Sequence, residues 1–118
     1  VEAFKDLYDY IKSKSPQIKI IFTVSPVRHV KDTLTLNNVS KSILRVACHK
    51  FCSFENVYYF PSYELVLDDL RDYRFYKGDL IHPNEIAEEY IWNYFKECFF
   101  DTNLKEFVHN WSAIINAM

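Results

Sequence analysis

The sequence predicts an α/β fold with parallel strands, as a single partial domain over residues 1–118. Two short runs of β-branched and aromatic residues, 18–24 and 57–60, are typical of buried strands. A helical pattern lies between them, and a strand–helix–strand order indicates parallel strands joined by a right-handed crossover. Because a doubly wound sheet carries more than two strands, we expect the C-terminal part of a larger three-layer α/β/α domain.

The first elements follow from apolar spacing and from proline. Apolar residues three and four positions apart predict an amphipathic helix over 3–13. Pro16 ends this helix because it cannot continue one. The strand at 18–24 comes next, and Ser25-Pro26 closes it. The apolar face of the helix consists of Phe4, Leu7, Tyr8 and Ile11.

A polar loop over 28–38 leads to a second helix of about fifteen residues. Asn37 or Asn38 can cap its start, because an amide oxygen accepts from the first free backbone N–H groups. The strand at 57–60 follows and stops at Pro61. The side chains expected to face the sheet from the second helix are Val39, Ile43, Leu44, Val46, Ala47 and Phe51.

The second half is predicted to be helical. A charged and aromatic connection contains a short helical turn near 64–70. Pro83 stands at a helix start, with Asn84 and Glu85 in the first turn, where they suit the helix dipole. A last helix covers 103–116. The apolar stripes are Ile86, Tyr90, Ile91, Tyr94, Phe95 and Cys98 on the first helix and Leu104, Phe107, Val108, Trp111 and Ile115 on the last.

Composition excludes several classes of partner. About half of the residues are apolar, which is enough for a core. A net charge of −2 gives no electrostatic case for nucleic acid. No apolar run reaches the length of a membrane span, so no membrane partner is expected. An odd number of cysteines, with no signal segment visible, favours reduced thiols and a cytoplasmic location.

We expect no metal or other cofactor. Cys48 and Cys52 share a helix face, which raises the alternative of a metal site together with His49. His49 points about 100° away from Cys48, and no second ligand pair follows at zinc-site spacing. These cysteines and Cys98 are therefore interpreted as packing residues.

The stretch GDLIHP, which opens the helix after residue 82, carries the strongest chemical signal. A histidine acting as general base needs one ring nitrogen free and the other held by a carboxylate. Asp79, three residues before His82, can fold back to that nitrogen in a tight loop. Gly78 allows the backbone to turn and Pro83 fixes the helix start. The alternative is that His82 ends the loop and Asp79 caps a turn.

Three stretches resemble the GSCFA family of the SGNH (GDSL-like) hydrolases: FTVSPVRH, VYYFPSYELVLDDLRDYRFY and DLIHPNEIAEEYIW. The resemblance implies an SGNH-like (flavodoxin-like) domain and a Ser-His-Asp triad, in which Asp79 and His82 are the aspartate and histidine. The family's Gly-Ser-Cys-Phe-Ala motif, with the nucleophile, does not occur in this sequence. Ser25 and Ser62 follow strands, but each adjoins a proline and neither lies in a glycine-rich turn.

Other polar residues are candidates for substrate binding. Ser25, Arg28 and His29 follow the strand at 18–24, and ligands gather beyond the carboxyl ends of parallel strands. Arg28 could hold an acidic or hydroxyl-rich substrate, and His29 could hydrogen-bond it. The alternative is a polar surface loop in which Ser25 caps a turn.

Arg71, Asp72 and Arg74 could orient the Asp79–His82 loop. The alternative is a local ion-pair network that contributes little free energy.

The sequence therefore predicts a serine ester hydrolase, inactive as this chain alone. Its substrate would be an acyl-ester small molecule or an O-acylated carbohydrate, as the resemblance implies. The alternative is a non-catalytic α/β interaction module that forms a homodimer through an exposed sheet edge or the terminal helix.

Overall fold

The computed structural model describes residues 2–29, 31 and 33–117. Two strands, four regular helices and three short helical segments follow one another along this part of the chain. In order they are α1 (Glu2–Lys14), β1 (Ile20–Thr23), α2 (Leu34–Phe51), β2 (Val57–Phe60), α3 (Ser62–Glu64), η1 (Leu65–Asp69), η2 (Tyr73–Phe75), α4 (Glu85–Phe99) and α5 (Thr102–Ala117). The predicted order of elements is confirmed, and α3 with η1 covers the helical turn expected near 64–70.

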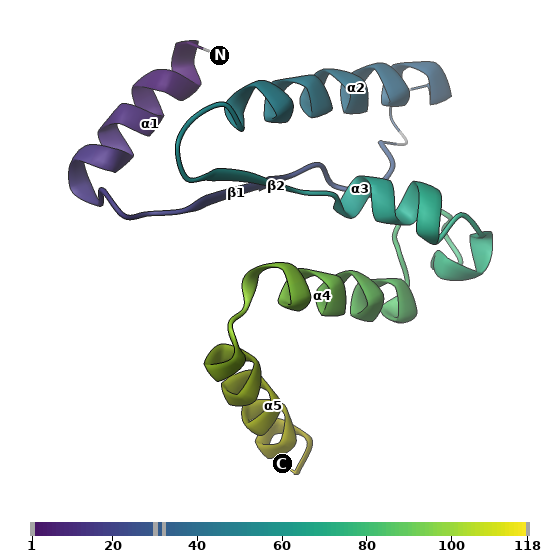
Figure 1. Ribbon diagram of the computed structural model, residues 1–118. Helices are drawn as coiled ribbons and strands as arrows, with labels where there is room; N and C mark the ends of the chain where they lie inside the picture. The colour runs from purple at the N-terminus through teal and green to yellow at the C-terminus, as the bar shows by residue number, and fades with distance from the viewer. Residues whose placement is uncertain (1, 30, 32, 118) are drawn as a thin grey trace.

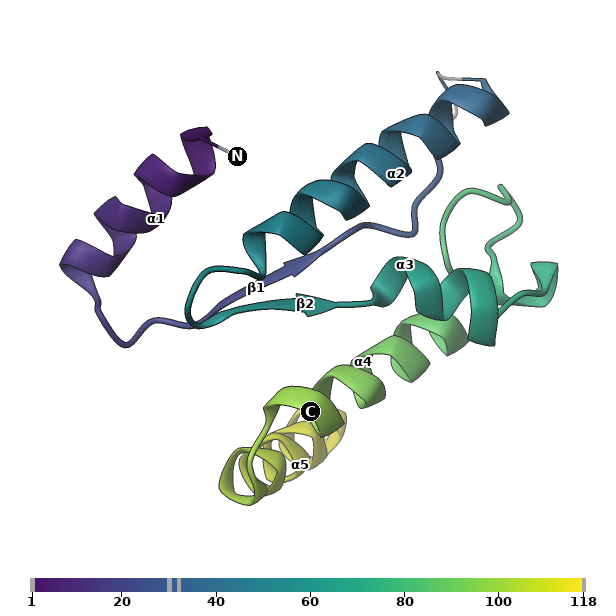
Figure 2. The ribbon, with the colours of Figure 1, turned by 45° about the horizontal axis from the view of Figure 1, so that its top comes forward.

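The two strands form a parallel sheet, as predicted. Ile20 lies opposite Val57 and Thr23 opposite Phe60. β1 is shorter than the apolar run at 18–24 from which it was expected. In Figures 1 and 2 α2 lies on one side of the two strands and α4 on the other. The fold is therefore a helix-rich α/β arrangement around a two-stranded parallel sheet.

Aromatic side chains fill the space on both sides of the sheet. Phe4 of α1 packs against Phe51 of α2 with ring centroids 4.2 Å apart, and against Phe22 of β1 at 5.3 Å. On the opposite side, Phe60 of β2 meets Phe95 of α4 edge to face at 5.0 Å. Such aromatic pairs contribute beyond the area they bury. The sheet is thus joined to α2 on one face and α4 on the other.

The expected orientation of α2 is wrong, except at Ala47 and Phe51, which are half-buried. α2 begins at Leu34, inside the segment expected to be a loop, because the Thr33 hydroxyl accepts from the N–H of Leu36 and caps it. Val30 and Asp32 of that expected loop lie outside the described residues. The buried side chains of α2 are Asn37, Lys41 and Cys48, whereas the exposed ones include Val39, Ile43, Leu44 and Val46.

Polar contacts account for this orientation. The ammonium group of Lys41 donates to the carbonyl of Ser25 at 2.6 Å, and the side-chain oxygen of Asn37 accepts from the N–H of His29 at 3.0 Å. Both contacts are made to the segment that follows β1. The polar side of α2 therefore faces the end of the sheet, and its apolar stripe points away from it.

The C-terminal helices also bury less apolar surface than their patterns predict. Asn84 is the residue before α4 and caps it, where Pro83 was expected to start the helix. Of the α4 stripe only Ile91 and Phe95 are half-buried, and the fully buried residue is Ala87. On α5 the expected stripe is exposed except for Val108, which is half-buried. Figure 1 shows α5 leading away from the sheet. No helix among the described residues is both long and apolar enough to cross a bilayer.

Candidate active site

Asp79 and His82 are in contact in the loop before α4. His82 Nδ1 lies 2.7 Å from Oδ2 of Asp79. The second carboxylate oxygen, Oδ1, accepts from the backbone N–H groups of Ile81 at 2.8 Å and His82 at 3.1 Å. The two side chains are 42% and 53% exposed. The structure thus brings the pair together within reach of solvent, and its catalytic role remains a prediction.

Leu80, and not Gly78, adopts the unusual backbone conformation of this loop. The N–H of Leu80 donates to the carbonyl of Lys77 at 2.9 Å, which closes a turn. Leu80 has a φ of 57°, in the left-handed region that side chains disfavour. Gly78 has no positive φ, and a Cβ added to it would meet nothing within 4 Å. The turning role expected of Gly78 is therefore carried by Leu80.

The hydrogen bonds around Asp79 keep its carboxylate ionised. The N–H of Ile81, followed by the ring and the N–H of His82, lowers the pKa of Asp79 to about 2. An ionised carboxylate can only accept, so Nδ1 carries the hydrogen of the contact. The other ring nitrogen of His82, Nε2, has no hydrogen bond to any described residue. Neutral His82 thus offers a lone pair at Nε2, which can take a proton from a hydroxyl group.

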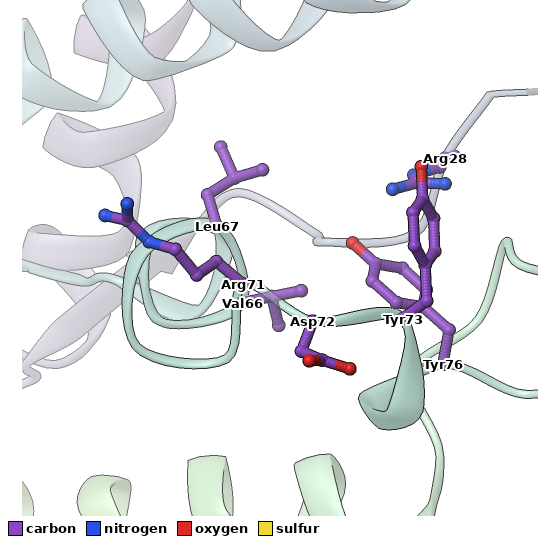
Figure 3. Close-up of a pocket in the computed structure, with 7 residues that line it drawn as sticks. All are labelled: Arg28, Val66, Leu67, Arg71, Asp72, Tyr73 and Tyr76. Carbon is purple, nitrogen blue, oxygen red and sulfur yellow. The ribbon is translucent and has the colours of Figure 1, made fainter.

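Arg28 holds this loop from the segment after β1. Its guanidinium Nη1 donates to the carbonyl of Leu80 at 2.9 Å, and its backbone N–H donates to the carbonyl of Ile81 at 3.3 Å. The guanidinium carbon lies 4.4 Å from the ring centroid of Tyr76 and 5.5 Å from that of Tyr73. Figure 3 shows Arg28 beside these two rings. In this structure Arg28 positions the loop, and its binding to substrate remains a prediction.

The helix side of the loop is held by Asn84. Its amide nitrogen donates to the carbonyl of Arg74 at 2.7 Å, and its oxygen accepts from the N–H of Ala87 at 3.1 Å. Its own N–H donates to the carbonyl of Phe75 at 2.9 Å. One side chain therefore ties η2 to the first turn of α4, with His82 between them. Sequence reasoning missed this role, although an asparagine before a helical pattern is a capping signal.

The remaining candidates form hydrogen bonds elsewhere and none to the pair. The hydroxyl of Ser25 accepts from the N–H of Val27 at 3.2 Å, as in the turn-capping alternative. The exposed His29 is held through its backbone by Asn37. Ser62 is buried and hydrogen-bonds Thr23 and the carbonyl of Val24. Among the described residues, none of these side chains forms a hydrogen bond or an ion pair with Asp79 or His82.

Arg71, Asp72 and Arg74 pair locally. Arg71 bonds to Asp68, three residues earlier, and its guanidinium points away from Tyr73 and Tyr76 in Figure 3. The carboxylate of Asp72 accepts from the N–H of Arg74 at 2.8 Å and caps η2. These exposed pairs contribute little free energy. Of these three residues, only Arg74 is linked to the Asp79–His82 loop, because its backbone carbonyl accepts a hydrogen bond from the side chain of Asn84.

An apolar cavity adjoins Pro83, just before the start of α4. It has a volume of about 460 Å³ and is bounded by α4 and the carboxyl end of the sheet. Pro83, the neighbour of His82, forms one wall, and Ile91, Trp92 and Phe95 of α4 form another. Neither Asp79 nor His82 lines this cavity, whose link to the pair is Pro83.

Within residues 2–29, 31 and 33–117, no three histidine, cysteine or acidic side chains come together in a group that could hold a metal ion. The thiols of Cys48, Cys52 and Cys98 are free.

The sequence model of the GSCFA family matches residues 1–95. This span contains both strands, the Asp79–His82 loop and most of α4. Comparison with curated proteins and with solved structures gives no match.

Proposed function

The chain belongs to the GSCFA family, and from this membership and the contact between Asp79 and His82 we propose that it carries the acid–base pair of a serine ester hydrolase. One observation supports the proposal most strongly. The ionised carboxylate of Asp79 holds Nδ1 of His82 at 2.7 Å, while Nε2 is open to a reacting group. This is the arrangement that a general base requires.

The proposed mechanism is acyl transfer through a serine. Nε2 of His82 takes the proton of the serine hydroxyl as its oxygen bonds to the ester carbonyl carbon. The imidazolium then gives that proton to the alkoxide that leaves when the ester bond breaks. Water, activated by the same nitrogen, releases the acid and restores the serine. Asp79 keeps Nδ1 protonated throughout and stabilises the imidazolium.

We place the nucleophile outside these 118 residues. Ser62 is buried and donates to the carbonyl of Val24, and Ser25 accepts from the N–H of Val27, so neither is presented to His82. The helices on both faces of the sheet are consistent with part of a three-layer, SGNH-like domain. The missing strands and the serine would come from further polypeptide.

An acyl ester is the substrate class that fits the surroundings. The apolar cavity that Pro83 lines, one residue after His82, would hold the acyl group. An O-acylated carbohydrate would place its polar part toward the solvent side of the loop. This assignment rests on the proposed chemistry.

Hydrolysis of nitrophenyl acetate by the polypeptide encoded by the complete reading frame tests the proposal. His82→Ala should lower kcat by about 10³-fold or more, because the general base is lost. His109→Ala is the matched control, since His109 is an exposed histidine on α5. The 118-residue chain alone should show no turnover that depends on His82. Full activity of His82→Ala would disprove the role.

A second candidate function is self-association, as a homodimer. The observation that favours it is the outward stripe of α2, where Leu36, Val39, Ile43 and Val46 are 48% to 64% exposed. Such a contiguous apolar face marks an interaction surface. Sedimentation equilibrium distinguishes the cases. Dimers weakened by Ile43→Lys would support this function, and a monomer at high concentration would remove it.

A further inference from the structure

Lys41 is buried without an acidic partner among the described residues. Its relative exposure is 2%, and its only hydrogen bond to a described residue is to the carbonyl of Ser25. An ammonium group has three N–H donors, so two remain. Burial lowers the pKa of this amine. Because an uncompensated buried charge costs stability, packing alone does not explain a lysine at this position.

The side chain lines a cavity of about 260 Å³ at the N-terminal end of α2. Arg28 contributes a second cation, and Leu34, the first residue of α2 and thus at the positive end of its helix dipole, also lines the cavity. None of the described residues that line the cavity is acidic. The other polar lining groups are Asn37, Asn38, Tyr63, Tyr73 and Tyr76.

Two of these groups have hydrogen-bonding capacity to spare. The oxygen of Asn37 accepts from His29, but its amide nitrogen has no partner among the described residues. The ring of Tyr63 lies 5.9 Å from the ammonium of Lys41, and no described residue bonds to its hydroxyl. Spare N–H and O–H donors around two cations are complementary to negatively charged oxygen atoms.

We propose that this cavity binds the oxyanion group of a small molecule, a carboxylate or a phosphate, with Lys41 as its ion-pair partner. The bound oxygen atoms would accept from the two free N–H donors of Lys41 and from the amide of Asn37. Tyr63 would add its hydroxyl. The cavity includes neither Asp79 nor His82, although Arg28 both lines it and holds their loop. The proposal stands whether or not the protein hydrolyses esters.

Calorimetric titration of the 118-residue chain tests the proposal. The probes are inorganic phosphate and glucuronate at constant ionic strength, with glucose as the neutral control. Both anions should bind with a Kd of about 10 mM or below, and glucose should not. Lys41→Met fills the same space without charge and should weaken binding about tenfold or more. Lys50→Met, an exposed lysine on the same helix, should leave it unchanged.

If Lys41→Met does not fold, a second variant and a second measurement still test the proposal. Tyr63→Phe keeps the ring and should weaken binding several-fold. Amide chemical shifts induced by phosphate should cluster at Asn37, Asn38 and Lys41. No binding of either anion, equal binding by Lys41→Met, or shifts confined to other parts of the chain would overturn the proposal.

Discussion

Replacing Asn84 by alanine should destabilise the protein by about 2 kcal/mol. The amide oxygen caps α4 at Ala87, and losing such a cap costs about 1 kcal/mol. The amide nitrogen donates to the carbonyl of Arg74 at 2.7 Å, a bond with a net contribution of about 1 kcal/mol. The two bonds share one side chain, so Asn84→Ala removes both. It also removes the side-chain link between η2 and the start of α4, while the backbone bond from residue 84 to Phe75 remains.

Asn84→Asp separates the two contributions. A carboxylate still accepts from Ala87 and suits the helix dipole, but it cannot donate to Arg74. This variant should therefore lose about 1 kcal/mol, close to half of the alanine effect. Asn93→Ala is the matched control, because Asn93 is exposed within α4 and caps nothing. There alanine should be neutral or slightly stabilising.

Urea unfolding followed by circular dichroism measures these differences. With a slope of about 2 kcal/mol per molar, a loss of 2 kcal/mol moves the midpoint down by about 1 M. The slope itself should not change, because the same surface is exposed on unfolding. An Asn84→Ala midpoint within about 0.2 M of the parent would refute the view that this side chain joins the loop to the helix.

Four further predictions concern the loop itself. Leu80→Gly should stabilise the protein by about 0.5–1 kcal/mol, because glycine adopts a positive φ without strain. Gly78→Ala should also stabilise it by about 0.4–1 kcal/mol, because the φ of Gly78 is ordinary and a Cβ there meets no other atom. A urea midpoint below that of the parent would contradict the prediction for that variant. Arg28→Met should cost about 1 kcal/mol and speed amide exchange at Ile81, since the bond to the Leu80 carbonyl is lost; unchanged exchange would show that Arg28 does not hold the loop. The folded-state pKa of Asp79 is lowered from 3.8 to about 2, so its stabilising effect is complete above about pH 5 and is lost as pH falls through 2. The parent should therefore exceed Asp79→Asn in unfolding free energy by more at about pH 5 than at about pH 2–3, and an equal difference at the two pH values would contradict this.

The strands and the Asp79–His82 contact could be predicted because both depend on local sequence. A β-branched run between proline residues has few alternatives to a strand, and a carboxylate three residues before a histidine reaches its ring through one turn. Gly78 was expected to let the backbone turn, whereas the left-handed residue of that turn is Leu80. Glycine tolerates a positive φ but does not require one, and Leu80 is held there by the bonds around it.

The orientation of α2 could not be predicted, because periodicity shows which residues share a face but not what that face meets. Val39 and Ile43 form a proper apolar stripe, yet Lys41 and Asn37 point inward to the segment after β1. The partner of Arg28 could not be predicted either, because Leu80 lies 52 residues away in the sequence. Contacts of that range depend on the tertiary fold.

The tautomer of His82 tests the central claim most directly. Long-range ¹H–¹⁵N spectra at about pH 9, where an ordinary imidazole is neutral, show which ring nitrogen carries the hydrogen. The contact with Asp79 predicts hydrogen on Nδ1 and a bare Nε2, and loss of this preference in Asp79→Ala. Hydrogen on Nε2 in the parent protein would leave no base at the exposed nitrogen and would contradict the proposed role.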